Sequence, residues 1–490
     1  LKANQVMLSQ LGYNVFTVPQ NEQLIGTNGK LNPHATLGRT YEWNGEKYYM
    51  TADDWNKAAY KNALRQDYTI SIKGSTDRSS FYTSLGYLSD DGVIDNSSYE
   101  RVSARLKADY QAKKWLKVGV NAQYVHSDTK SNPNLSSETD ATNLMYFVSS
   151  IAPIYPIYVR TVDANGKPVI KTDANGHEMY DYGNPKYYGV NRPFISNGNP
   201  LGANRYNKVE SGFNQINGSV FADIKFAEWL KFNATSTIIY DMTDFSDYQN
   251  AYEGPKQGVN GELTKKNTAD LRTNNTQTLT FMKSFGKHSF DALLGHEYYK
   301  LTRKYLLGEA EGGFSPSITE LNAFANKKNN GSYKLNYNVE GFFGRAQYNY
   351  DDKYFASASY RRDASSRFAK ENRWGNFWSI GGAWLINKEA WFEAPFVDEL
   401  KVKASLGQQG NDNIGDWAYT DLYTLSKASN TLMSPTFWRM GNKDITWETT
   451  TNLNLGVEFS LFKHRLSGSF DFYTKKVADL LFWLSIPESQ

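Results

Sequence analysis

Side chains alternate between two faces throughout residues 337–388, and this alternation constrains the fold more than any other feature of the chain. Phe342 and Tyr348 share one face, whereas Arg345 and Gln347 share the other. A period of two is the pattern of a β-strand, because successive side chains point to opposite faces of the pleat. The stretch predicts three long strands, the first two joined by a tight turn and the last two by a longer loop.

The same alternation recurs along most of the chain, which indicates an all-β, antiparallel fold built from hairpins. Polar segments rich in Gly, Asn and Asp separate the alternating runs, as expected of turns and loops. The predicted strands cover residues 66–74, 80–89, 97–110, 115–128, 206–226, 229–247, 263–284, 288–305, 337–350, 354–364, 374–387, 399–408, 446–461 and 464–482.

The connections between these strands alternate in length, so that tight turns fall at one end of the hairpins and longer loops at the other. The longest predicted loops cover residues 129–205, 306–336 and 409–445. A transmembrane β-barrel has this asymmetry, with short periplasmic turns and long extracellular loops. A soluble sandwich or propeller is the alternative, although strands this long are uncommon there.

Composition agrees with a membrane barrel and excludes several other classes. The 54 basic and 51 acidic residues nearly balance, so charge gives no reason to expect nucleic acid as a partner. The chain has no cysteine, which rules out disulfides and thiolate metal sites within it. No apolar run reaches the ~18 residues of a transmembrane helix. The mean hydropathy of −0.62 is compatible with barrel strands, which are only half apolar.

Aromatic residues with neighbouring lysines recur beside the tight turns. Trp115 and Trp229 each stand in a Trp-Leu-Lys element just after a turn. Phe285, Phe396 and Phe462 occupy equivalent places. Aromatic rings favour the membrane–water boundary, and lysines beside them reach water. Hydrophobic plugs at the base of a soluble barrel are the alternative explanation.

The chain resembles the SusC/RagA-type TonB-dependent outer-membrane transporters of Bacteroidetes. The resemblance begins with the run Ile70 to Leu88 and continues, in the family's order, to the end of the chain. It includes Leu294-Gly295-His296-Glu297 and the run Tyr360 to Phe368. Further matches are Gly92 to Ile94, Tyr99 to Arg101, Trp115 to Gly119, Trp384, Lys401 to Gln408, Trp447 to Glu458 and Asp471 to Tyr473.

The resemblance implies a fold of which this chain is a part. Family members have a 22-stranded barrel occluded by an N-terminal plug, and only about 14 of those strands are predicted here. We therefore expect residues 1–65 to be a loop-rich region, with a short helix near residues 52–64, that leads into the barrel. Residues 66–490 are expected to form an incomplete transmembrane β-barrel, with the plug and the last strands missing from the chain.

The resemblance also implies function, partners and location. We expect active import of oligosaccharides across the outer membrane of a Gram-negative bacterium, driven by TonB-ExbB-ExbD through the missing N-terminal region. A SusD-like surface lipoprotein would cap the barrel, and outer-membrane lipid would surround it. The alternatives are a peptide importer of the RagA type, a siderophore transporter and a soluble β-rich glycan-binding protein. An outer-membrane barrel enzyme would need a catalytic cluster on one face.

The sequence shows no motif of a catalytic or metal site, so we predict neither an enzyme nor a cofactor. His288 and His296 lie roughly 26 Å apart along one predicted strand, too far to share a metal ion. The paired acids Asp53-Asp54, Asp90-Asp91 and Asp351-Asp352 stand in predicted turns and loops, where turn chemistry explains them.

The duplicated segments Asp163 to Gly166 and Asp173 to Gly176 each contain an Asn-Gly turn signal within the first long loop. They predict a small hairpin. A calcium loop is the alternative, but it would need more acidic ligands in register.

Candidate ligand-binding residues are Arg345, Arg361, Asp363 and Arg367, which the alternation places on the inner face or at its loop-side rim. Their second interpretation is an electrostatic lining in which arginines pair with carboxylates of neighbouring strands. We expect Gln347 and Ser357 to share the inner face. Phe342, Ala346, Tyr348, Trp378 and Trp384 are expected to face lipid.

Overall fold

The computed structural model describes residues 15–131, 143–193, 195–196, 198–252, 254–429 and 431–484. Residues 1–14 of the predicted N-terminal region, residues 132–142 of the predicted first long loop and residues 485–490 of the predicted barrel lie outside the described residues.

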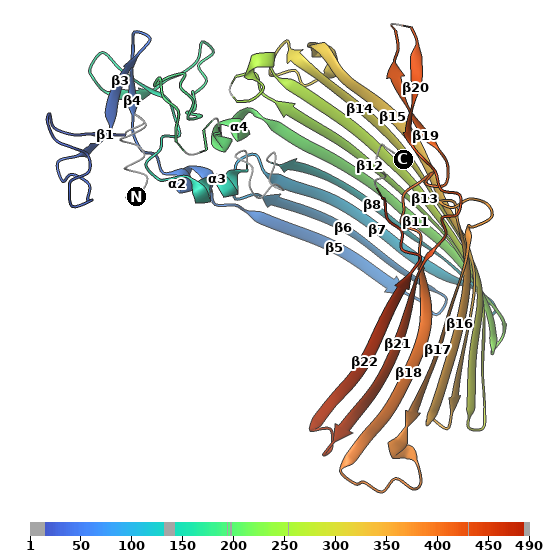
Figure 1. Ribbon diagram of the computed structural model, residues 1–490. Helices are drawn as coiled ribbons and strands as arrows, with labels where there is room; N and C mark the ends of the chain where they lie inside the picture. Colours follow the sequence, from blue (N-terminus) through green and yellow to red (C-terminus); the bar gives the residue numbers. More distant parts are fainter. Residues whose placement is uncertain are drawn as a thin grey trace.

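One antiparallel sheet of 14 strands makes up most of the described chain and curves strongly, with β5 and β22 at its two edges (Figure 1). Its strands follow one another in chain order, each paired with the next, which confirms the predicted fold class. The strands are β5 (Arg65–Ser75), β6 (Ser79–Asp91), β7 (Ser98–Lys113), β8 (Leu116–Ser131), β11 (Lys208–Ala227), β12 (Leu230–Gln249), β13 (Glu262–Phe285), β14 (His288–Gly313), β15 (Phe324–Tyr350), β16 (Tyr354–Ser365), β17 (Trp374–Leu385), β18 (Val397–Asn411), β21 (Glu448–Leu461) and β22 (Leu466–Ala478).

Each predicted strand is present, but the predicted loop 306–336 is largely wrong. β14 continues to Gly313 and β15 already begins at Phe324, with the short helix η2 (Leu321–Ala323) between them. The polar run from Asn326 to Ser332 has no alternation of apolar residues, and its pairing with β14 holds it in a strand. The predicted loop 409–445 likewise contains a separate hairpin of β19 (Leu422–Lys427) and β20 (Met433–Arg439).

The two faces of the sheet differ as the alternation predicts. Tyr360 stands opposite Trp378, and the Tyr354 ring stacks on Trp384, so these aromatic side chains share one face. The opposite face bounds a cavity of about 840 Å³. Its lining includes Asp291, Gln347, Ser357, Lys401, Lys403 and Asn454. The polar face is therefore the hollow one, and Trp378 and Trp384 lie on the other face.

The tight turns have the chemistry that the sequence predicts. Asp351 and Asp352 both adopt positive φ angles, of 56° and 51°, which suit a two-residue hairpin turn. Asp351 also pairs with Lys287 of the neighbouring turn at 2.8 Å. The aromatic residues predicted near the turns, Trp115, Trp229, Phe285, Phe396 and Phe462, are all exposed at this end of the sheet.

A smaller module stands at the loop end of the sheet, beyond the start of β5 (Figure 1). Two segments far apart in the sequence share its core, in which Met50 and Trp55 pack with Phe147, Tyr155 and Val159. Its elements are β1 (Phe16–Thr17), β2 (Thr36–Leu37), β3 (Arg39–Trp43), β4 (Glu46–Met50), α2 (Trp55–Ala59), α3 (Leu144–Ser150), β9 (Arg160–Val162), β10 (Pro168–Ile170) and α4 (Pro200–Tyr206). We call this unit the loop-side module.

Ion pairs and hydrogen bonds join the two segments of the loop-side module. Arg160 donates to both oxygens of Asp53, at 2.9 and 2.6 Å. The predicted helix near residues 52–64 is shorter than expected. Asp54 caps its start, and Lys61 already donates its backbone N–H to the Val93 carbonyl of the β6–β7 loop.

Both duplicated Asn-Gly segments form tight turns, which confirms the predicted small hairpin. Asp163 accepts hydrogen bonds from the backbone of Asn165 and Lys167, and Asp173 accepts them from Asn175 and His177. β9 and β10 flank the first turn. The two aspartates are therefore engaged in their own turns.

Two short helices complete the description: η1 (Gln257–Val259) in the β12–β13 loop and η3 (Ile386–Lys388) after β17. No helix in the described part of the chain is long and apolar enough to cross a membrane.

The loop-side module should loosen in acid through Glu46. Lys171 and the Tyr48 hydroxyl bond to its carboxylate and lower its pKa. Burial, together with this hydrogen bond, raises the pKa of Tyr48 to about 12. Because the Glu46 pKa is depressed in the folded state, its stabilisation is present above the ordinary value of about 4.3 and disappears as the pH falls through the folded value.

We therefore expect the protection factors of residues 39–50 and 160–171, which correct exchange rates for the slowing of intrinsic amide exchange in acid, to fall between pH 6 and pH 3. The fall should be smaller in Glu46→Gln, which lacks the titrating group. An equal fall in both proteins would contradict the assignment to Glu46.

Candidate functional site

Arg361 forms the centre of a charged cluster on the hollow face of the sheet. Its Nε donates to both oxygens of Asp363, at 2.7 and 2.8 Å, and its Nη2 donates to Glu297 of β14 at 2.9 Å. The guanidinium also lies over the Phe343 ring, 5.1 Å from the centroid. Asp363 is only 7% exposed, so the arginine compensates a carboxylate that is largely removed from water.

Gly341 makes room for this cluster. It stands directly opposite Asp363 in the β15–β16 ladder. A Cβ atom at position 341 would overlap with the Asp363 carboxylate and with the Arg361 guanidinium. Any larger residue at position 341 would therefore force the Asp363 and Arg361 side chains to shift.

A second set of ion pairs continues along the same face toward β12. Arg272 contacts Asp241 on β12 and Asp270 on its own strand, and Arg303 donates to both oxygens of Asp270 at 2.7 Å. Asn274, on the same strand as Arg272, donates to Glu297 of the first cluster at 3.0 Å. The inner wall from β12 to β16 thus carries alternating positive and negative groups.

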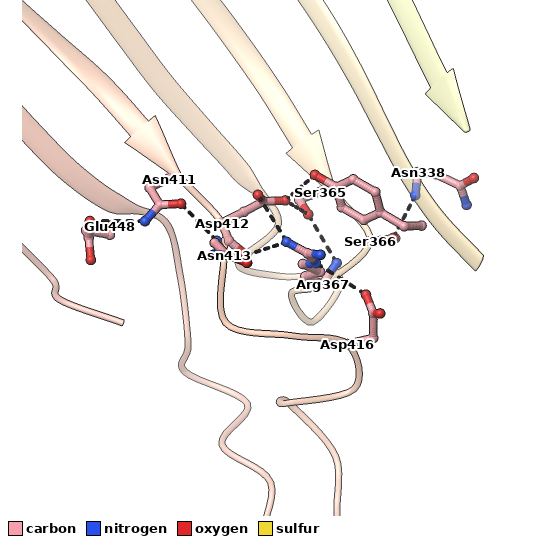
Figure 2. Close-up of polar contacts among 10 residues, drawn as sticks. Asn338, Ser365, Ser366, Arg367, Asn411, Asp412, Asn413, Asp416 and Glu448 are labelled. Carbon is pink, nitrogen blue, oxygen red and sulfur yellow. Dashed lines mark hydrogen bonds and ion pairs between the residues drawn. The ribbon is translucent and has the colours of Figure 1, made fainter. Parts of the chain in front are cut away.

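Arg367 lies at the end of the β15–β16 ladder, where the strands give way to loops (Figure 2). It contacts the carboxylates of Asp412, at 3.6 Å, and Asp416, at 3.3 Å, and its guanidinium stacks on Tyr337, 4.3 Å from the ring centroid. Asp412 in turn accepts hydrogen bonds from Tyr337 at 2.7 Å and Ser365 at 2.6 Å. This ladder-end cluster ties the start of the 409–445 segment to β15 and β16.

The four candidate residues therefore fall into three places. Arg361 and Asp363 contact each other, Arg367 lies beyond them in the ladder-end cluster, and Arg345 pairs with Asp291 at 3.9 Å, away from the others. A hollow of about 410 Å³ lies beside Arg361 and Asp363. Ser359, Phe377, Ser379, Gln408 and Trp447 are among the residues that complete its lining.

The sequence did not reveal the carboxylates that hold these arginines. Glu297, Asp412 and Asp416 stand 64, 45 and 49 positions away from the arginines they contact. Only the register between strands brings them together. A search for charged residues on the inner face of each predicted strand could have found Glu297, whereas Asp412 and Asp416 lie where a loop was predicted.

The described residues contain no group of three or more His, Asp or Glu side chains that could hold a metal ion. His296 instead joins Gln277, at 2.8 Å, and Glu340, at 3.2 Å, in a hydrogen-bonded cluster on the face of the aromatic residues. His288 contacts the Tyr348 hydroxyl at 2.7 Å. Both histidines therefore act in strand-to-strand contacts.

The sheet order, its hollow polar face and its aromatic outer face agree with the family that the sequence resembles. Residues 163–490 match the model of the TonB dependent receptor-like β-barrel family. The chain belongs to this family. It is part of an outer-membrane β-barrel of the SusC/RagA-like TonB-dependent receptors.

Relatives and solved structures agree with this assignment. The TonB-dependent receptor SusC of Bacteroides thetaiotaomicron is 28% identical over 457 residues, which covers 89% of this chain and 43% of SusC. The TonB-dependent receptor P3 of Formosa agariphila is 27% identical, over 89% of this chain and 42% of that receptor. The RagAB peptide transporter superposes with a TM-score of 0.74 at 25% identity, over 92% of this chain and 48% of that chain. The chain thus spans less than half the length of these proteins.

Removing the cation at Arg361 should destabilise the barrel. In Arg361→Gln, Asp363 and Glu297 lose their compensating charge, which costs about 1–3 kcal/mol. We expect the variant to unfold at lower temperature in SDS, seen as a shift in the temperature at which gel mobility changes. Adding Asp363→Asn should restore part of the loss, because it removes the buried, uncompensated charge. Unfolding of Arg361→Gln at the wild-type temperature would contradict this role.

Proposed function

We propose that the protein containing this chain imports oligosaccharides across the outer membrane by a TonB-dependent mechanism. The main observation behind the proposal is that the two faces of the sheet differ. Its fourteen antiparallel strands have tight turns at one end, one face is polar and bounds a cavity, and the opposite face is aromatic. Membership of the receptor family supports it. The soluble glycan-binding alternative does not fit a chain of this outer-membrane family.

The inner wall suits a hydroxyl-rich ligand. The hollow beside Arg361 combines aromatic rings, Phe377 and Trp447, with the hydroxyls of Ser359 and Ser379. Sugar rings pack on aromatic faces, and their hydroxyls bond to polar side chains in such concave sites. We propose that Arg361 and Asp363 border the ligand path, with Arg367 at its outer rim and Arg345 farther toward the tight turns.

Peptide import is the second candidate, because the chain superposes on the RagAB peptide transporter over nearly its whole length. The Arg–carboxylate pairs of the inner wall would then bind peptide termini and charged side chains. Siderophore import is a third candidate within the same family.

We further propose that the complete protein couples to TonB-ExbB-ExbD and acts with a SusD-like surface lipoprotein. The RagAB structures are described as an importer in "closed-closed" and "open-open" states, which supports a two-component design with a moving lid. We also propose residue 65 as the boundary of the barrel wall, because β5, the first strand of the large sheet, begins at Arg65.

Uptake by cells that carry the complete protein tests the proposal. We expect fluorescent oligosaccharides to enter the periplasm, and uptake to stop when the proton gradient is dissipated or TonB is deleted. A matched set of labelled peptides and an iron-loaded siderophore separates the three cargo classes. Cells that accumulate none of the three by an energised route would contradict import, whereas peptide uptake alone would contradict the oligosaccharide assignment.

A further inference from the structure

β15 extends well beyond its neighbour on one side. It pairs with β14 along almost its whole length, but with β16 only from Val339 to Tyr350. In the part of the chain that the structure describes, no strand pairs with the other edge of residues 324–338. This free edge belongs to the part of β15 that continues past the end of the shorter strand β16 (Figure 1).

Alternation identifies the backbone groups that point to this edge. Asn338 uses its carbonyl to accept the Ser366 N–H, and its own N–H donates to Ser366 Oγ, so position 338 faces the β16 side (Figure 2). Because strand backbone groups alternate in direction, residues 336, 334, 332 and 330 also face that side. The next irregularity is a bulge, where pairing with β14 skips Lys328. A regular edge of about seven residues, roughly 23 Å long, thus stands open.

Two lysine side chains, one on β15 and one on β14, lie at or next to this edge without an ion-pair partner among the described residues. Lys334 stands directly opposite Lys304 in the β14–β15 ladder, and neither has a carboxylate within ion-pair distance in the described part of the chain. Like charges directly opposite each other destabilise a strand pair. By contrast, Lys328 of the same strand is neutralised by Glu262 and Glu311. An anionic group beside Lys334 would remove the repulsion.

We propose that the free edge of β15, residues 330–336, binds an extended, acidic segment of a protein partner at the cell surface by adding it as a further strand. Main-chain hydrogen bonds supply the pairing, and carboxylates next to Lys334 and Lys304 supply the charge match. A lysine on an edge strand usually prevents pairing between identical sheets. At this edge, Lys334 favours an acidic strand over a neutral or basic one. The proposal does not depend on which cargo is imported.

Binding of a synthetic strand to the complete protein in detergent micelles tests the proposal. The probe is a capped, fluorescent peptide of alternating glutamate and valine. The matched controls are the lysine–valine peptide and a glutamate–valine peptide N-methylated at every second residue. We expect fluorescence anisotropy to show at least tenfold weaker binding of both controls. No binding of the acidic probe, or equal binding of its N-methylated form, would overturn the proposal.

Ser332→Pro removes one N–H that points to the free edge and leaves the β14 side intact, since proline is tolerated on edge strands. We expect it to weaken probe binding at least tenfold, whereas Ser332→Ala binds as the wild type does. If only Lys304→Ala and Lys334→Ala weaken binding, the edge is a general anion site, and strand addition is wrong. If cells import the probe in competition with nutrient cargo, the occupant is cargo rather than a partner, and the assignment is also wrong.

Discussion

Backbone hydrogen bonding in a medium without water is the constraint on which this structure depends. An unpaired N–H or C=O in lipid costs several kcal/mol, so strands cross a membrane only when each is paired on both sides. The chain meets this demand for the strands between β5 and β22, which have a neighbour in the sheet on both sides, whereas β5 and β22 have one neighbour each among the described residues. In the described structure, the part of β15 before Val339 is paired with β14 alone, so its other edge stays open. The demand does not apply to backbone groups that water can reach.

The two faces of the sheet are stabilised by different interactions. On the outer face, aromatic pairs such as Tyr354 with Trp384 cover neighbouring strands. On the inner face, arginines compensate carboxylates across strands, as Arg361 does for Glu297 and Asp363. These inner contacts hold the wall together before any ligand arrives. A ligand that bonds to Arg361 must therefore compete with, or add to, contacts that already exist.

The sequence predicts the strands well because period-two alternation is a local signal. It predicts each of the 14 strands of the sheet, the Asp351-Asp352 turn and the sharing of one face by Phe342 and Trp378. It misses the upper part of β15, where Asn326 to Ser332 are polar on both faces and only pairing with β14 makes them a strand.

Contacts between distant segments were beyond prediction for a different reason. Trp55 packs against Phe147 in the loop-side module, and Arg367 bonds to Asp416 in the ladder-end cluster. Neither pair leaves a local pattern, because its members lie far apart in the chain. Face and charge single out Arg361 and Asp363 as candidates, whereas the contact of Arg361 with Glu297 depends on the register of three strands.

Cysteine labelling tests the central claim, that the polar face lines a water-filled lumen and the aromatic face meets lipid. The chain has no cysteine of its own, and Ala358 and Ser359 are neighbours on β16 that point to opposite faces. In intact outer membranes, we predict that Ser359→Cys reacts with a charged, water-soluble maleimide, whereas Ala358→Cys reacts only with a lipid-soluble one. The reverse pattern, or equal reactivity of both positions toward the charged reagent, would contradict the account.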